Sequence, residues 1–309
     1  MPHKFHYGGQ AVMEGVMMRG QQATVTVVRR PNGELASEVK AVPAISGWLR
    51  QSPFIRGFIV LIEAMVLGIR SLLYSANVAL EDEDEKISGG LVWLMVAVSL
   101  TFAVGLFFVA PLFLTKLLDA YIGSSLVFHL IEGLVRLVIF IIYLKLIGSL
   151  KDIKRTFTYH GAEHKTINAY EAGVPLEVEA VRGYSTTHLR CGTSFILTVL
   201  VIAIFVFALV GRNSLPVMVL SRIVLIPAIA IIGYEATRLA AAHPENGLVR
   251  VFIAPGLWLQ RLTTKEPDDG QLEVAISALK QTLAIDDKAA EVAQAPASEA
   301  SSKSSLDSP

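Results

Sequence analysis

Two histidines and a glutamate fall within five residues in the segment YHGAEHK, residues 159–165. On an α-helix, His160 and His164 are four residues apart and share one face, which Glu163 flanks. Two imidazoles at this spacing can bind one zinc ion, and the order His-x-x-Glu-His is the reversed zincin motif, in which the glutamate is the base. The spacing therefore predicts a divalent metal site, most simply Zn²⁺, with His160 and His164 as ligands and Glu163 as catalytic base.

A catalytic zinc has three protein ligands, whereas a structural zinc has four. The segment THLRCGTSF supplies His188 and Cys191 just before an apolar run, and we expect them to complete the metal site. Glu171 shares the histidine face but lies ~10 Å further along the helix axis than His164, too far to be a ligand of an unbroken helix. The sequence leaves open whether the site is catalytic or structural. A third alternative is metal-free, with the histidines bonded to head groups or backbone at a membrane boundary.

The composition is typical of a membrane protein. Of the 309 residues, 53% are apolar and 17% are charged, and lysine plus arginine balances aspartate plus glutamate at 27 each. The apolar excess indicates membrane helices with soluble flanks, and the balanced charge predicts no nucleic-acid partner. A single cysteine excludes an intrachain disulfide and fits a reducing compartment or a metal ligand. The first twenty residues lack an apolar core of signal-peptide length, so we expect membrane insertion through internal segments.

Four apolar runs are long enough to cross a bilayer. They are residues 91–114, 126–144, 194–210 and 217–234, the last with an expected kink at Pro227. We therefore predict a mainly α membrane protein with a bundle of about four transmembrane helices over 91–236.

An earlier apolar segment, within residues 51–80, carries Arg56, Glu63 and Arg70 at intervals of seven. A helix places these charges on one stripe, which predicts an amphipathic helix that lies on the membrane or packs against the bundle. A fifth span is the alternative, although charges at mid-helix are costly in lipid.

A polar stripe also occurs inside one predicted span. His129, Glu132 and Arg136 recur at helical spacing in residues 126–144. Ionisable groups in membrane helices usually face the bundle interior and pair, so we expect an ion pair between Glu132 and Arg136. A proton or substrate path is the alternative.

Basic residues are concentrated in the N-terminal arm, residues 1–50, and in a central loop, residues 145–193. The positive-inside rule then places the N-terminus, this loop and the C-terminus in the cytoplasm. We therefore expect a multi-pass protein of the cytoplasmic membrane, with lipid as a partner.

The flanks have their own expected structure. The arm 1–50 combines a glycine-rich segment with a β-hairpin centred on Pro-Asn-Gly, and Glu14 and Arg19 are expected near the metal. A link at 81–86 is acidic. Residues 237–286 form a C-terminal cytoplasmic segment with a helix, and the Ala/Ser/Pro-rich residues 287–309 are predicted to be disordered.

Four segments, in order, resemble the YqhQ-like family of multi-pass membrane proteins over roughly residues 5–285. They are GGQAVMEGVMMRG, RTFTYHGAEHKTINAYEAG, HLRCGTSF and PGLWLQRLTTKEPDDGQLEVAISAL. The family is a bacterial domain of unknown function with plastid relatives, often labelled a predicted metal-dependent enzyme. The resemblance implies metal dependence through the histidine motif, which falls here on His160, Glu163, His164, His188 and Cys191.

Two functions fit these features. The first is a zinc hydrolase of the bacterial inner membrane, with its site at the cytoplasmic face and a peptide or lipid as substrate. The second is a non-catalytic, metal-stabilised scaffold or accessory factor in membrane-protein assembly or translocation, with other membrane proteins as partners. Transport, based on the polar stripe alone, is a weaker third.

Overall fold

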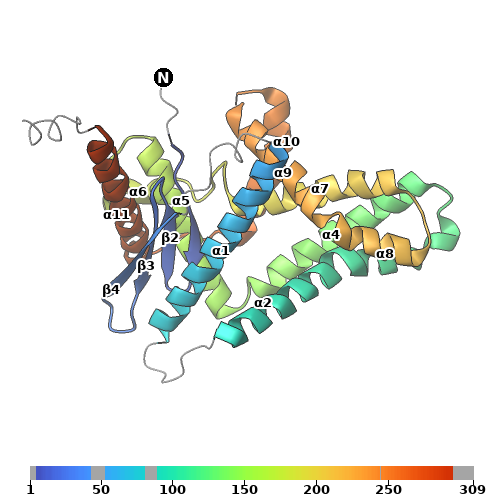
Figure 1. Ribbon diagram of the computed structural model, residues 1–309, viewed down its shortest axis with the longest axis horizontal. Coiled ribbons are helices and arrows are strands. Elements are labelled where there is room, and N and C mark those ends of the chain that lie inside the picture. The colour runs from blue at the N-terminus through green and yellow to red at the C-terminus, as the bar shows by residue number, and fades with distance from the viewer. Residues whose placement is uncertain (1–4, 43–52, 81–88, 244, 295–309) are drawn as a thin grey trace, which may run out of the picture.

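The computed structural model describes residues 5–42, 53–80, 89–243 and 245–294. Within them, a polar α/β layer lies at one end and an apolar helical bundle at the other, with helix α1 (Pro53–Ala79) between the two (Figure 1). The acidic link 81–86 lies outside the described residues.

The N-terminal arm forms a four-stranded antiparallel sheet with the strand order β1-β2-β3-β4. The strands are β1 (Gly8–Val12), β2 (Gly15–Arg19), β3 (Ala23–Arg29) and β4 (Leu35–Ala41). The predicted hairpin is confirmed, since β3 and β4 pair across a turn in which Gly33 has a positive φ of 90°. The glycine-rich segment forms a second hairpin, β1–β2.

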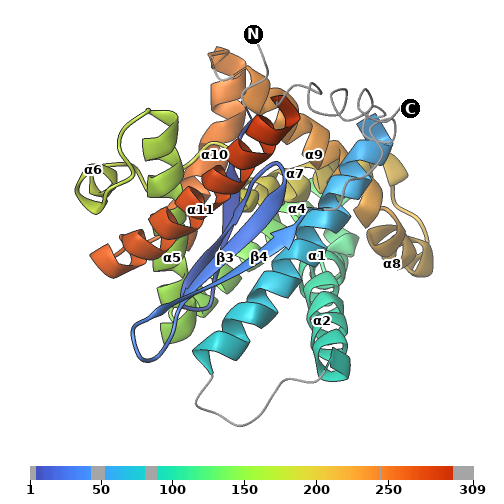
Figure 2. The same cartoon turned by 60° about the vertical axis from the view of Figure 1, so that its left-hand side comes forward.

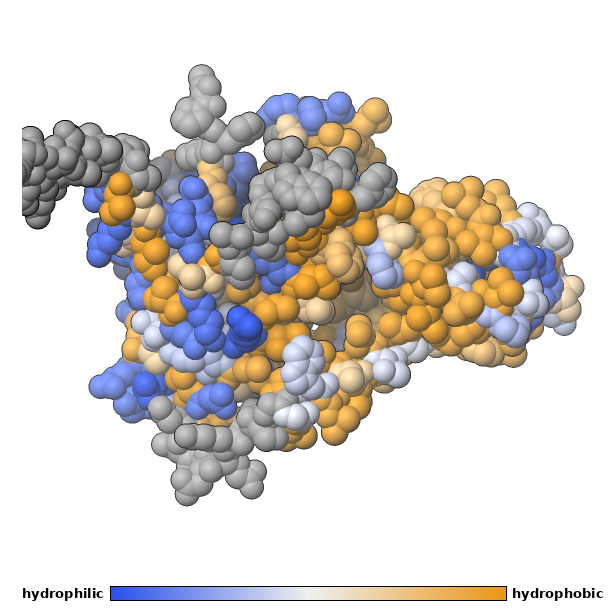
Figure 3. All heavy atoms as spheres, viewed as in Figure 1, coloured by the Kyte–Doolittle hydropathy of each residue, from blue (hydrophilic) through white to orange (hydrophobic). Residues whose placement is uncertain are grey.

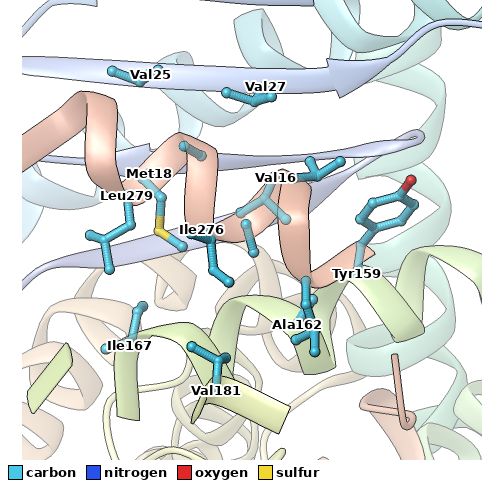
Figure 4. Packing of buried hydrophobic residues seen from close by; sticks show 14 of the residues in the cluster. Val16, Met18, Val25, Val27, Tyr159, Ala162, Ile167, Val181, Ile276 and Leu279 are labelled. Carbon is cyan, nitrogen blue, oxygen red and sulfur yellow. The ribbon is translucent and has the colours of Figure 1, made fainter. Parts of the chain in front are cut away.

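Helices cover both faces of the sheet. Helices α5 (Lys151–Glu171), α6 (Val178–Arg182) and α11 (Asp269–Gln294) lie on one face, and α1 lies on the other (Figure 2). Alternate side chains of β3 therefore meet different partners. Val25 and Val27 pack with α5 and α11 (Figure 4), whereas Thr26 Oγ1 donates to Ser71 Oγ of α1 at 3.0 Å. The central segment 145–193, predicted as a connection between two spans with a helix over the histidine motif, contains α5 and α6.

Helix α11 extends further than the sequence analysis predicted. It continues to Gln294, eight residues into the segment expected to be disordered, and residues 295–309 lie outside the described part of the chain. Its Asp286 carboxylate accepts the backbone N–H groups of Gln21 and Gln22, at 2.8 and 2.9 Å. These bonds attach α11 to the turn between β2 and β3. The C-terminal segment therefore belongs to the same layer as the N-terminal arm.

The bundle is built from apolar helices. They are α2 (Gly89–Val104), which continues through a π-helical turn η1 (Gly105–Val109) into α3 (Ala110–Lys116), then α4 (Ser125–Ile147), α7 (Gly192–Val210), α8 (Leu215–Val224), α9 (Ile226–Ala242) and α10 (Gly247–Thr263). Apolar side chains dominate the surface of the bundle, and polar ones gather over the α/β layer and at the opposite tip (Figure 3).

Three of the described helical stretches are long and apolar enough to cross a membrane: Ile55–Ala79, Gly90–Lys116 and Gly192–Val210. Helices α8 and α9 together make a fourth candidate, bent by 46° next to the expected Pro227 kink. The prediction of about four spans agrees in number and differs in membership. Helix α4, the predicted second span, is not among the three, whereas the helix over 55–79 is, as the alternative for that segment allowed.

A buried ionic cluster fastens α4 to α8. Glu132 accepts from Arg136 Nη2 at 2.8 Å, as predicted, and also from Arg222 Nη2 at 2.5 Å. His129 Nδ1 lies 3.1 Å from the same carboxylate, and all four side chains are at most 1% exposed. The sequence predicted one ion pair, and the structure shows a network because α8 returns beside α4.

Candidate metal centre

The histidine motif lies on the most enclosed part of α5. Residues 161–167 are all buried although several are polar, because α5 is held between the sheet and the segment that follows α10. Gly161 allows this close packing, because a Cβ at this position would overlap the carbonyl oxygen of Lys265. The backbone N–H of Lys265 donates to Phe157 O at 2.9 Å. The close approach of the two segments thus depends on the glycine between the motif's histidine and glutamate.

Main-chain carbonyl groups orient both histidines of the motif. His160 Nδ1 lies 2.9 Å from Thr263 O, and His164 Nδ1 lies 2.7 Å from Thr186 O. A carbonyl oxygen can only accept, so each Nδ1 carries the hydrogen. Burial, reinforced by the neighbouring His160, lowers the pKa of His164 to about 3, so this imidazole is neutral at pH 7. Its Nε2 therefore presents a lone pair, which is the form that binds metal ions.

Cys191 completes a group of three potential ligands. It caps the N-terminus of α7 and is buried, and its Sγ lies 3.3 Å from His160 Nε2. One donor atom each from His160, His164 and Cys191 lies within 4.8 Å of the others. Tetrahedral zinc holds nitrogen and sulfur ligands roughly 3.3–3.6 Å apart, given bond lengths of about 2.0 and 2.3 Å. The distance of 3.3 Å between Cys191 Sγ and His160 Nε2 matches this spacing, and the three donor atoms are gathered within 4.8 Å of one another.

His188 lies beside this group rather than in it. Its ring centroid is 5.7 Å from that of His164, and its Nε2 lies 3.5 Å from Glu171 Oε2. Burial lowers the pKa of His188 to about 4. The backbone N–H of His188 donates to Gln260 Oε1 at 2.8 Å. Glu171 was excluded as a ligand by its position along the helix. It is instead the neighbour of His188, the predicted ligand that lies outside the group of three.

Glu163 is buried on the same face of α5. It is 5% exposed, and burial raises the pKa of its carboxyl group to about 7, while His160 and the backbone N–H of Gly9 act in the opposite direction. A Cβ at Gly9 would lie 3.0 Å from Glu163 Cγ and overlap Met17 O. Strand β1 therefore approaches Glu163 this closely because residue 9 is glycine.

A cavity of about 270 Å³ opens in front of these side chains. Its walls come from the N-terminal segment, strands β1 and β2, helices α1 and α5, and the residues just before and at the start of α7. They include Gly9, Arg19, Leu67, His160, Glu163, His164, His188, Arg190 and Cys191. Arg19 pairs with Glu63 of α1 at 2.5 Å and lies near the site, as expected. Glu14 does not line the cavity; it pairs with Arg155 and accepts from Tyr159 Oη at 3.2 Å.

Sequence reasoning missed the residues that support the site. Gln260 is fully buried on α10 and donates from its Nε2 to His188 O at 2.8 Å and to Ser194 Oγ at 2.9 Å. Thr186 and Thr263 act through their backbone, which carries no side-chain signal. Gln260 does have a signal, a lone amide in the apolar run PGLWLQRL.

The fold and the site define a mainly helical chain with a small antiparallel sheet, several apolar helices and a cluster of groups that could bind a metal ion. The chain belongs to the family described as "Protein of unknown function (DUF1385)", whose profile matches residues 52–285. It is similar to the "Uncharacterized protein YqhQ" of Bacillus subtilis (strain 168), with 37% identity over 296 residues that cover 91% of this chain and 93% of that protein. No solved structure matches the chain. The family expected from the four sequence segments is thereby confirmed.

Proposed function

We propose that this protein is a zinc-dependent hydrolase of the cytoplasmic membrane, with His160, His164 and Cys191 as metal ligands. The observation that carries the proposal is the group of three donor atoms within 4.8 Å of one another at the wall of a 270 Å³ cavity that also contains Glu163. Three protein ligands leave a coordination position for water or substrate, which distinguishes catalytic from structural zinc sites.

The donor set fits zinc. Imidazole nitrogen and thiolate sulfur suit Zn²⁺ better than Mg²⁺ or Ca²⁺, which prefer oxygen ligands. Both imidazoles are held by Nδ1–H bonds to carbonyl oxygens, the arrangement that commonly orients metal-binding histidines. Burial raises the pKa of the Cys191 thiol, and a bound cation would counter this by stabilising the thiolate.

Glu163 is the candidate base. Its carboxyl group lines the cavity on the same face as the ligands and is one residue from His164. A bound divalent cation would supply Lewis acidity to a water molecule and to a carbonyl or phosphoryl oxygen. Glu163 would accept a proton from that water and return it to the leaving group. The N–H of Gly9 holds the carboxylate in place, and the sheet and α1 limit the access of bulk water.

The proposed orientation places the α/β layer and both termini in the cytoplasm. The bundle end opposite the sheet carries the short links 117–124 and 211–214, where Arg212 Nη1 donates to Ile122 O at 2.7 Å. Those links would face the other side of the membrane. The metal centre lies where α7 begins, so it would sit at the cytoplasmic boundary and reach substrates in or near the bilayer.

A non-catalytic scaffold or assembly factor is the second candidate, and one observation favours it. A metal bound by His160, His164 and Cys191 would cross-link α5 of the polar layer to α7 of the bundle. Such a link would stabilise the whole molecule without chemistry, most simply if His188 moved to become a fourth ligand.

The test separates metal binding from chemistry. The full chain is purified in detergent, its zinc content is measured by elemental analysis, and variants are tested for complementation of a host deletion strain. A hydrolase predicts that Glu163→Gln keeps one zinc per chain and wild-type thermal stability but loses function, whereas His164→Ala loses zinc. The exposed Glu177→Gln is the matched control.

A different result points elsewhere. If Glu163→Gln complements fully while His164→Ala and Cys191→Ser lose both zinc and stability, the scaffold function replaces the hydrolase. Wild-type protein without bound metal would overturn both.

A further inference from the structure

A second and larger cavity lies next to the candidate metal centre. It has a volume of about 630 Å³, within the range of about 300–1,000 Å³ usual for small-molecule sites. Its walls come from α1, α7 and α9, which lie close together (Figure 1). It shares His6, Ala64, Arg190, Cys191 and Gly192 with the cavity in front of Glu163. The two spaces therefore meet at the ligand Cys191.

The lining of this chamber is amphiphilic. Val60, Leu61 and Phe195 are among its apolar residues, whereas the charged side chains are Arg190 and Arg238. No acidic side chain occurs among the described residues that line it. A molecule that fills the chamber would therefore need an apolar body and gain from a negative charge.

Arg190 is placed to hold that charge. One end of its guanidinium pairs with Glu171, while its Nε is buried without a hydrogen-bond partner among the described residues. Arg190 lines both cavities, so an anionic group in the chamber would lie beside its positive charge. Arg238 also lines the chamber. Its Nη1 lies 3.7 Å from Glu235, a carboxylate that Arg56 Nη2 already engages at 2.6 Å.

The surroundings favour a ligand that arrives from the bilayer. The chamber lies between three helices that are candidate spans or part of one. The outer sides of α1 and α9 expose large apolar groups, among them Phe58 and Ile62 on α1 and Ile232 and Leu239 on α9. A lipid that reaches the chamber from the bilayer would thus meet apolar side chains on both helices, which a free anion in water would not need.

We propose that the chamber binds an anionic phospholipid, with its acyl chain between α1, α7 and α9 and its phosphate on Arg190 and Arg238, so that the head group lies beside the metal centre. This rests on the proposed function and names its substrate class. Binding alone is inferred here, and the ligand position follows from the amphiphilic lining and the two arginines in it.

The experiment measures lipid retention by the full chain. Protein reconstituted with equal amounts of phosphatidylglycerol and phosphatidylcholine of identical acyl chains is extracted gently, and bound lipid is quantified by native mass spectrometry. The wild type should retain phosphatidylglycerol about ten-fold over phosphatidylcholine, because both lipids present a phosphate but the choline cation of phosphatidylcholine is repelled by the two arginines. Arg190→Gln and Arg238→Gln should each remove most of this preference, and Ala64→Trp should reduce both lipids by filling the junction of the two cavities.

Controls fix the interpretation. Arg261→Gln removes an exposed arginine outside the chamber and should leave the preference unchanged. Equal retention of the two lipids, or a preference that survives Arg190→Gln, would overturn the proposal. So would displacement of phosphatidylglycerol by millimolar inorganic phosphate alone, which would indicate a site for soluble anions. Zinc is measured in the same samples. A lipid preference in protein without zinc would contradict the hydrolase and support the lipid site. Zinc in protein without a lipid preference would contradict the lipid site and leave the hydrolase in place.

Discussion

The ring orientations of His160 and His164 are set by main-chain carbonyl groups from segments that come later in the chain. Thr186 and Thr263 hold the two Nδ1–H groups and turn both Nε2 atoms towards Cys191. The spacing of the motif predicted that the histidines share a face, and this is confirmed. It could not predict which ring nitrogen is exposed, because that depends on backbone atoms over 20 and 100 residues away.

Gly161 tests whether this orientation depends on close packing. Gly161→Ala would push a Cβ into the carbonyl oxygen of Lys265 and should displace the segment that orients His160. We expect a loss of about 3 kcal/mol in stability and a weaker metal site. Gly183→Ala is the control, since a Cβ there meets no atom within 4 Å. If the Gly161→Ala and Gly183→Ala proteins unfold at the same temperature, this packing argument is wrong.

Gln260 gives a second prediction at this scale. Gln260→Leu keeps the size of the side chain but leaves His188 N, His188 O and Ser194 Oγ without their buried partner. Unsatisfied buried groups cost about 1–3 kcal/mol each, so chemical denaturation should show a loss of at least 2 kcal/mol. Gln281→Leu, which removes a bond to Ser277 within one helix, should cost less than about 1 kcal/mol.

At the scale of elements, the sequence best predicted the helices and strands that have a clear local pattern. The hairpin around Pro-Asn-Gly, the helix over the histidine motif and the C-terminal helix all follow from local pattern and formed as predicted. The β1–β2 hairpin was missed because its glycines serve close packing and mask the alternation of strand residues. Helix α5 is polar by composition, yet it is buried between elements distant in sequence, which no local pattern indicates.

Glu132 joins two elements of the bundle and yields a prediction about them. Glu132→Gln would leave Arg136 and Arg222 buried together without a counter-charge. Removing one partner of a buried ionic group costs about 3–5 kcal/mol, so the temperature of thermal unfolding, measured in detergent, should fall sharply. Glu273→Gln is the comparison: its pair with Arg29 is exposed and should contribute less than about 1 kcal/mol. Similar stabilities of the two variants would show that the network does not fasten α4 to α8.

At the scale of the whole molecule, three distant parts of the chain build one layer. The N-terminal sheet, α5 and α11 share a core that includes Val27, Ile167 and Leu279 (Figure 4). The sequence analysis assigned these parts to separate domains, since no local pattern reports a contact across more than 200 residues. It did place the histidine and cysteine segments at neighbouring membrane edges, and the structure brings them together.

The orientation of the molecule in the membrane is a prediction at this scale. Alkaline phosphatase fused within the 211–214 link should be active, because that link is expected outside the cytoplasm, and a green fluorescent protein fused after residue 294 should fluoresce inside the cell. Active phosphatase at the C-terminal position would reverse the orientation and place the metal centre on the opposite face.

The central claim, that His160, His164 and Cys191 hold one zinc ion, is tested most directly by X-ray absorption at the zinc edge. The full chain purified without chelators should show one sulfur neighbour at about 2.3 Å and nitrogen or oxygen neighbours at about 2.0–2.1 Å. Cys191→Ser should remove the sulfur contribution. A wild-type spectrum without sulfur, or a protein that binds no zinc, would contradict the claim.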